Sequence, residues 1–283
     1  MSIKLVASDL DGTLVDHNNF IPAKNLDAIK SMHNKNVDFA ICTGKTYSIT
    51  KDICSKCNAS YGIFGNGTLI VDLNTGKEIY KNLVSIEDFN SCYNIAKEHN
   101  LHIHIYTDTE IITEFLMYMD LRNYILNGSK DTENLHFKIV PNIKEYVNTN
   151  NSQIFKLVIS SDESLDNVKD ILIKNIPLTI NHIKKKKQYK DMIINKEYEY
   201  LDITPKNIGK GYALNYLSNF LHVDTNDIIA IGDNVNDIDM LKNSGIGVTL
   251  SDAYDEIKKV ATYTTTNTVA NSGFAEAIYK FVT

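Results

Sequence analysis

The sequence predicts an α/β protein, in which a doubly wound, Rossmann-like parallel sheet contains an inserted α+β domain. Three observations support this fold class. Short apolar runs alternate with helical segments at both ends of the chain, as in βαβ units. Polar segments follow or adjoin these runs, at residues 9–13, 43–45, 210–211 and 232–237. Between about residues 83 and 187, helical segments alternate instead with amphipathic strands.

The first elements form two successive βα units. Residues 3–8 are an apolar run rich in β-branched residues, which predicts a buried strand ending at Asp-Leu-Asp-Gly. Pro22 begins a helix, because the first turn tolerates proline. Residues 37–42 predict a second strand and residues 48–56 a second helix. Two such units indicate a parallel sheet with right-handed crossovers.

A hairpin and the inserted domain come next. Apolar residues 61–64 and 68–71 flank a Gly-Asn-Gly turn, and a short strand is expected at residues 78–80. The insert is predicted to span residues 83–187. Its expected helices are residues 86–98, 114–126 and 163–174, and its expected strands are residues 101–106, 137–140, 154–160 and 178–183.

The first domain is predicted to resume after the insert, so that it comprises residues 1–82 and 188–283. Residues 208–221 and 237–243 predict helices on either side of an apolar strand at residues 228–231. Short units at residues 245–250 and 261–264 then precede a last helix from about Gly273.

The composition is that of an ordinary globular protein. Of its 283 residues, 43% are hydrophobic and 23% charged. The net charge of −6 argues against a nucleic-acid polymer as partner, because such binding requires a basic excess. No apolar segment reaches the length of a membrane span, and the first residues lack a signal-peptide pattern. We therefore expect a cytoplasmic protein without a membrane partner, as a monomer or weak homodimer.

Four cysteines are too few and too irregularly spaced for a disulfide framework. Cys54 and Cys57 form a Cys-x-x-Cys pair, which raises the alternative of a metal or redox site. Since no second pair accompanies them, two ordinary thiols on a helix are the better interpretation.

Paired carboxylates follow the first strand. A phosphate monoester resists attack because it is anionic and has a poor leaving group, so its cleavage needs charge neutralisation, a nucleophile and a proton donor. Asp9 is suited to attack phosphorus and form an aspartyl-phosphate. Asp11 is suited to protonate the leaving oxygen and then to accept a proton from water. Gly12 permits the tight turn that exposes backbone amides to an anion.

Further polar groups follow the other strands. Mg²⁺ prefers carboxylate, carbonyl and water oxygens, so Asp233 is expected to be one of its ligands, with Asp237 as a direct or indirect partner. The hydroxyl of Thr43 and neighbouring amides, including that of Gly44, are expected to bind phosphoryl oxygens.

Two more residues complete the predicted site. Lys210 supplies a positive charge against the developing negative one, and Asn236 is expected to orient the phosphoryl group or the nucleophile. Each segment alone also fits a turn, a strand end, a solvated helix residue or a capping loop. Their order and their common place at strand ends favour a Mg²⁺-dependent phosphatase of small phosphorylated metabolites.

These motifs resemble those of the haloacid dehalogenase-like phosphatases, and within them the Cof-type branch with an α/β cap (subclass IIB), over nearly the whole chain. The resemblance implies that Asp9 is the nucleophile and Asp11 the acid/base. It also implies Mg²⁺ on Asp9, the Asp11 carbonyl and Asp233, and phosphate on Thr43 and Lys210. The insert would then be the cap. One position departs from the pattern, since the family often has arginine at residue 45, and lysine lacks its bidentate fork.

Substrate selection is expected in the cap. Alternation along residues 101–106 places His102, His104 and Tyr106 on one face of a strand. If this face looks onto the active site, these residues and Lys156 would contact the leaving group, but for any single one of them a solvated sheet face is the favoured interpretation.

Two other functions remain open from the sequence. A sugar phosphomutase uses the same aspartyl-phosphate but returns the phosphoryl group to a sugar. A sensor of phosphorylated ligands would not catalyse at all. The paired carboxylates argue against a sensor, because it would need neither a nucleophile nor an acid.

Overall fold

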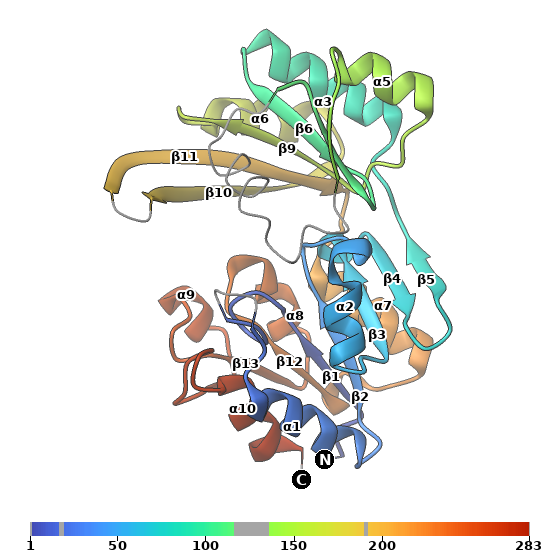
Figure 1. The fold of residues 1–283 in the computed structure, drawn as a ribbon, viewed down its shortest axis with the longest axis vertical. Coiled ribbons are helices and arrows are strands. Elements are labelled where there is room, and N and C mark those ends of the chain that lie inside the picture. Colours follow the sequence, from blue (N-terminus) through green and yellow to red (C-terminus); the bar gives the residue numbers. More distant parts are fainter. Residues whose placement is uncertain (1, 17–19, 116–135, 190–191, 283) are drawn as a thin grey trace. The chain divides into compact units, whose positions relative to one another are not determined.

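The chain forms two compact units in a computed structural model, which describes residues 2–16, 20–115, 136–189 and 192–282 (Figure 1). The core unit comprises Met1–Lys81 and Ile208–Thr283, and the insert unit comprises Asn82–Asn207. The first boundary lies one residue before the predicted one. The second differs from the prediction by twenty residues, because residues 188–207 belong to the insert unit.

An eight-stranded sheet forms the centre of the core unit, in the order β14-β13-β12-β1-β2-β3-β4-β5. β1 (Leu5–Ser8) pairs in parallel with both β2 (Asp38–Cys42) and β12 (Ile228–Ile231). The strand order therefore reverses between β1 and β12, and such reversals leave a crevice for ligands at the carboxyl ends of the strands. The predicted doubly wound sheet is confirmed.

The remaining strands extend this sheet at both sides. β3 pairs in parallel with β2, while β4 and β5 are antiparallel, as the predicted hairpin requires. On the other side, β13 and β14 continue the parallel part. Their bounds are β3 (Tyr61–Phe64), β4 (Leu69–Asp72), β5 (Lys77–Lys81), β13 (Ile246–Thr249) and β14 (Tyr263–Thr264).

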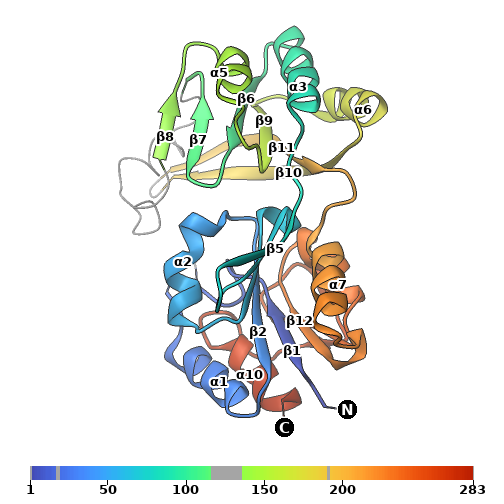
Figure 2. The ribbon, with the colours of Figure 1, turned by 90° about the vertical axis from the view of Figure 1, so that its right-hand side faces the viewer.

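Helices cover both faces of the core sheet (Figure 2). One face packs against α1 (Ala23–His33), α2 (Tyr47–Lys56) and α10 (Gly273–Phe281), and the other against α7 (Lys210–Leu221). α8 (Ile238–Lys242) shares the hydrophobic cluster of α7 and so packs on the same face. Short helices lie at η1 (Gly65–Gly67), η3 (Thr225–Asp227), η4 (Val235–Asp237) and α9 (Asp255–Lys258). Because side chains alternate along each strand, Leu5 faces the α7 side, whereas Phe39 meets the Phe274 ring at 5.8 Å on the opposite side.

The insert unit contains a six-stranded sheet in the order β10-β11-β9-β6-β7-β8. Its helices, α3 (Ile86–Glu98), α5 (Ile143–Asn150) and α6 (Asp166–Asn175), contribute to one hydrophobic cluster with the aliphatic residues of the central strands. The strands are β6 (His102–Tyr106), β7 (Glu110–Thr113), β8 (His136–Ile139), β9 (Lys156–Ser161), β10 (Leu178–Tyr189) and β11 (Met192–Pro205). An α+β unit is therefore present, as predicted.

Three details of the insert differ from the sequence-based expectation. The segment after residue 188 does not return to the core sheet, because β11 pairs antiparallel with both β10 and β9. The strand β7 and the helix α5 were not predicted, since both are short, at four and eight residues. The helix predicted at residues 114–126 falls mostly outside the described residues.

Candidate active site

Asp9 lies at the carboxyl end of β1, where its backbone N–H donates to the carbonyl of Ile231 at 2.8 Å and so joins the ends of β1 and β12. Its side chain is only 6% exposed. The ammonium of Lys210, at the start of α7, donates to Asp9 Oδ1 at 2.5 Å and to Asp237 Oδ1 at 2.6 Å. Residues 201 positions apart in the chain thus form one buried ion-pair network.

Asp233 follows β12 and approaches the turn after β1. Its Oδ1 accepts a hydrogen bond from the Thr13 hydroxyl at 2.5 Å. A β-carbon on Gly12 would lie 2.7 Å from Asp233 Oδ2, and Gly12 also has a φ of +84°. Both the close approach and the backbone angle therefore require glycine at this position.

Asp237 lies in η4 and is fully buried. Its Oδ2 accepts hydrogen bonds from the backbone N–H of Asp233 at 3.1 Å and of Asn234 at 3.0 Å, while its Oδ1 accepts from Lys210. This carboxylate therefore fixes the loop after β12 and the ammonium of Lys210 together.

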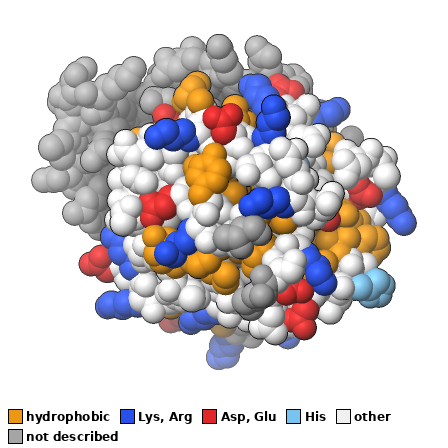
Figure 3. Space-filling model, turned by 90° about the horizontal axis from the view of Figure 1, so that it is seen from below, with side chains coloured by type: hydrophobic (Ala, Val, Ile, Leu, Met, Phe, Trp, Pro, Cys, Tyr) orange, Lys and Arg blue, Asp and Glu red, His pale blue; other side chains and the backbone are white. Residues whose placement is uncertain are grey.

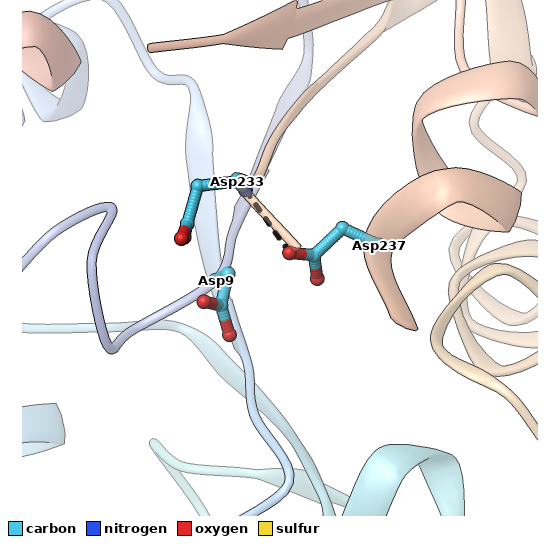
Figure 4. A group of neighbouring side chains, drawn as sticks. All are labelled: Asp9, Asp233 and Asp237. Carbon is cyan, nitrogen blue, oxygen red and sulfur yellow. Dashed lines mark hydrogen bonds between the residues drawn. The ribbon is translucent and has the colours of Figure 1, made fainter. Parts of the chain in front are cut away.

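The three aspartates form a group that fits a metal ion. Each offers one carboxylate oxygen, and these oxygens lie within 4.8 Å of one another. Figure 4 shows the side chains of Asp9, Asp233 and Asp237 gathered at the strand ends, with the bond from the Asp233 backbone to Asp237 dashed. Three carboxylates beside one ammonium leave two uncompensated negative charges when all are ionised. Hard oxygen donors with this charge suit a divalent cation such as Mg²⁺.

The acidity of these carboxyls reflects the same crowding. Burial raises the pKa of Asp9 well above its usual range, and Asp237 and Asp233 raise it further, whereas Lys210 acts in the opposite direction. Burial likewise raises the pKa of Asp233 from 3.8 to about 6, although the Thr13 hydroxyl lowers it. For Lys210, burial would lower the pKa, but its two aspartate partners outweigh burial and raise it.

The raised pKa of Asp233 predicts a pH-dependent stability. A carboxyl whose folded pKa exceeds its unfolded value stabilises the fold below the unfolded pKa, and this contribution disappears as the pH rises through about 6. Because a divalent cation bound by this group would compete with the proton, added Mg²⁺ should raise the melting temperature more at about pH 7.5 than at about pH 5. Scanning calorimetry measures both effects. Asp233→Asn is the control, in which the pH dependence of the Mg²⁺ effect should shrink; an equal effect at both pH values in the unmodified protein would contradict this account.

Thr43 and Gly44 follow β2, as predicted. Thr43 is buried, its N–H donates to the Ile63 carbonyl at 2.8 Å, and its hydroxyl accepts from the Lys45 N–H at 3.1 Å. The Lys45 ammonium donates to Asp11 Oδ1 at 2.8 Å. The Asp11 carboxylate is thus exposed and paired with Lys45, and among the described residues it is not part of the aspartate group.

Asn236 forms a second link between segments that are distant in the chain. Its side-chain amide donates to Asn66 Oδ1 at 3.0 Å, which joins η4 to η1. The same Asn66 oxygen lies 3.0 Å from where a β-carbon on Gly44 would stand. The sequence marks Asn66 only as part of a Gly-Asn-Gly turn, so its contacts with two predicted phosphate-binding segments were not expected.

The predicted polar face of the insert is buried rather than solvated. His102 and His104 are 3% and 4% exposed, so the favoured prediction of a solvated face is wrong for both. His102 Nε2 lies 2.9 Å from the Thr113 hydroxyl. Lys156 donates to Asp202 Oδ2 at 3.1 Å and lies over the Tyr106 ring, 4.6 Å from its centroid.

The cysteines are all buried free thiols. Burial raises the pKa of Cys54 and of Cys57 to about 12 each. Since the thiolate is the form that binds metals and exchanges disulfides, ordinary packed thiols are the interpretation that this environment supports.

Comparison with known proteins connects this geometry to described families. A model of the haloacid dehalogenase-like hydrolase family matches residues 6–278. A 5-amino-6-(5-phospho-D-ribitylamino)uracil phosphatase of Bacillus subtilis is 28% identical over 284 residues, covering 100% of this chain and 97% of that protein. A phosphoglycolate phosphatase of Methanobrevibacter smithii is 26% identical over 295 residues and covers 100% of both chains.

Solved structures share the fold over the same length. A haloacid dehalogenase-like hydrolase from Bacillus subtilis superposes with a TM-score of 0.81 at 18% identity, over 99% of this chain and 100% of that one. A sugar phosphatase of subclass IIB superposes with a TM-score of 0.75 at 18% identity, over 98% of each chain. These two likenesses establish the architecture of both units.

Proposed function

Because the chain belongs to the haloacid dehalogenase-like hydrolase family, in its Cof-type branch, and is a phosphoric monoester hydrolase, we propose that it transfers a phosphoryl group from a small metabolite first to Asp9 and then to water. The single observation that supports this most strongly is the buried Asp9 carboxylate, whose Oδ1 is bound by Lys210 at 2.5 Å beside two further aspartates. A protein that only bound a phosphorylated ligand would have no need of a nucleophile held in this way.

Asp9 begins the reaction. Lys210 fixes Oδ1, so Oδ2 is the oxygen that attacks phosphorus, forming the new O–P bond as the bond to the leaving oxygen breaks. Asp11, once its carboxylate has left Lys45 and taken up a proton from solvent, donates that proton to the leaving oxygen. In the second half, water attacks the aspartyl-phosphate, Asp11 accepts the proton from water, and Asp9 regains its carboxylate.

Several residues would bind the transferred group. The Thr43 hydroxyl and the Gly44 N–H are proposed to bind phosphoryl oxygens, with Asn236 orienting them and Lys210 neutralising the growing charge. Asp9, Asp233 and the Asp11 carbonyl would bind Mg²⁺, with Asp237 beside them. The ion, when bound, screens the repulsion between Asp9 and the anionic substrate.

Phosphate release from an aryl phosphate tests this proposal. Turnover is expected with Mg²⁺ and should be lost after treatment with a chelator, then restored by Mg²⁺. A requirement for a bisphosphorylated sugar activator would instead favour a phosphomutase. Absence of turnover on a broad panel of phosphorylated metabolites, in folded and Mg²⁺-loaded protein, would overturn the proposal in favour of a sensor.

We further propose that the polar face of the insert selects the leaving group, as the cap would. His104 Nδ1 is buried without a hydrogen-bond partner among the described residues. Burial, with His102 and Lys156 nearby, lowers the pKa of His104 to about 3, so the ring is neutral at physiological pH. The positive charge of Lys156 is balanced by Asp202. Neutral donors and acceptors of this kind suit hydroxyl groups, as in sugar or polyol phosphates, better than a second phosphate.

His104→Ala should therefore change the ranking of substrates. We expect kcat/KM for the preferred metabolite to fall about tenfold, as when a buried polar contact to a substrate is lost, while turnover of a small aryl phosphate changes little. A panel of phosphate esters measures this. His99→Ala, an exposed position in the same unit, is the matched control. An equal loss on every substrate would remove the assignment.

The mixed charges on one face of the molecule agree with a small-molecule substrate rather than a nucleic-acid polymer. On the face drawn in Figure 3, basic and acidic side chains are interspersed with hydrophobic ones rather than gathered by sign. In the described part of the chain, the structure contains no helix with the length and apolar character needed to cross a membrane. We propose no nucleic-acid or membrane partner, and a monomer or weak homodimer in the cytoplasm.

A further inference from the structure

The first turn of α7 has no cap of its own. Its N-cap residue is Gly209, which has no side chain, and the helix begins at Lys210. The first amides of a helix lack intrahelical acceptors, so they need a partner from elsewhere. This end of α7 matters because the Lys210 ammonium reaches both Asp9 and Asp237 from it.

Asp239 provides that partner from another element. Its Oδ2 accepts a hydrogen bond from the Gly211 N–H at 2.9 Å, and its Oδ1 accepts from the Met240 N–H at 2.9 Å. One carboxylate therefore satisfies amides in the first turns of both α7 and α8. In this way Asp239 performs for α7 the task that an N-cap side chain usually performs within its own helix.

The fit around Asp239 is close. A β-carbon on Gly209 would lie 2.6 Å from Asp239 Oδ2, and one on Gly211 would lie 2.8 Å from its Cγ. The glycines on either side of Lys210 thus make room for this carboxylate. Gly67, in η1, also lies close to the start of α7, because a β-carbon there would lie 2.6 Å from the Gly209 carbonyl oxygen.

We propose that Asp239 is a positioning residue, which fixes the first turn of α7 and thereby the place of the Lys210 ammonium. Its catalytic consequence rests on the function proposed above. Charge stabilisation in a transition state depends on donors that are already in place, and a shift of about 1 Å can cost up to about a hundredfold in rate. Among the described residues, the hydrogen bonds that Asp239 accepts come from backbone amides, so its effect would pass through Lys210.

Asp239→Ala and Asp239→Asn test this proposal together. Alanine removes both acceptors, whereas asparagine keeps the shape and one acceptor oxygen. Asp224→Ala is the matched control: Asp224 caps η3, accepting from the Asn226 N–H at 2.8 Å, but it lies after the other end of α7. Hydrogen exchange by mass spectrometry reports on the first turn of α7, and steady-state kinetics with an aryl phosphate reports on catalysis.

In Asp239→Ala, exchange at the first turn of α7 should accelerate about tenfold and kcat should fall about tenfold with a smaller change in KM. Asp239→Asn should recover most of both, and Asp224→Ala should change neither. Unchanged exchange in Asp239→Ala, or faster exchange with an unchanged kcat, would overturn the proposal. If the unmodified protein turned over no phosphate ester, the proposed function would fail, while the exchange data would still decide whether Asp239 fixes this turn.

Discussion

Replacing Asp9 by asparagine is expected to reduce phosphate release by a factor on the order of 10⁴, because the neutral amide cannot attack phosphorus. The effect should fall on kcat for every substrate, since the nucleophile acts in each turnover. Release from an aryl phosphate and from the preferred metabolite measures it. With the unmodified enzyme, acid quenching during turnover should trap a phosphorylated peptide containing Asp9, and the asparagine variant should yield none.

The fold should tolerate this change. Burial and two neighbouring carboxylates raise the pKa of Asp9, so a neutral side chain of the same shape relieves repulsion there. The melting temperature of Asp9→Asn should therefore equal or exceed that of the unmodified protein in the absence of Mg²⁺. Asp27→Asn, on the exposed side of α1, is the control and should leave activity unchanged. Full activity in Asp9→Asn would eliminate Asp9 as the nucleophile.

Lys210→Met should impair both stability and activity. The Lys210 side chain is 1% exposed and is bound to Asp9 and Asp237, so its removal leaves two buried carboxylates without their counter-charge. Removing one partner of a buried ion pair typically costs about 3 kcal/mol or more. We expect the free energy of unfolding of the metal-free protein, measured with urea, to fall by this amount. We also expect a large fall in kcat, because the phosphoryl charge is no longer neutralised.

Mg²⁺ and a surface variant separate these two effects. Because the ion compensates the same carboxylates, saturating Mg²⁺ should recover part of the stability of Lys210→Met but little of its activity. Lys242→Met, an exposed lysine in the last turn of α8, should change neither property. A Lys210→Met protein with unchanged unfolding free energy would show that the ion pair contributes nothing net, and that its role is catalytic alone.

The apolar strands of the core unit could be predicted because each is a short buried run that ends at a polar segment. Residues 228–231 are the clearest case, since the predicted strand and β12 coincide. The return point of the insert could not be predicted in this way. Residues 192–205 have the pattern of a strand in either sheet, and only the pairing of β11 with β9 and β10 assigns them to the insert unit.

Some residues of the candidate site could also be predicted from the sequence, whereas others could not. Asp9 and Asp233 could be predicted because parallel strands place their carboxyl ends at one edge of the sheet. Lys210 was predicted from its motif alone, since it begins α7 after β11, which belongs to the insert sheet. By contrast, the pairing of Asp11 with Lys45 and the contact of Asp239 with α7 depend on how loops and helices pack. Local sequence encodes neither, because these partners are far apart in the chain and nothing in their spacing marks them as neighbours.

The sequence by itself thus determined the parallel sheet, the order of the polar segments along the chain and the family to which the chain belongs. Those features follow from local hydrophobic pattern and from motifs that the backbone places at strand ends. Only the tertiary structure decided that His102 and His104 are buried, that Lys210 lies between Asp9 and Asp237, and that Asp239 caps a helix other than its own. Such arrangements require distant side chains to meet, and their burial and distances exist only once the chain has packed.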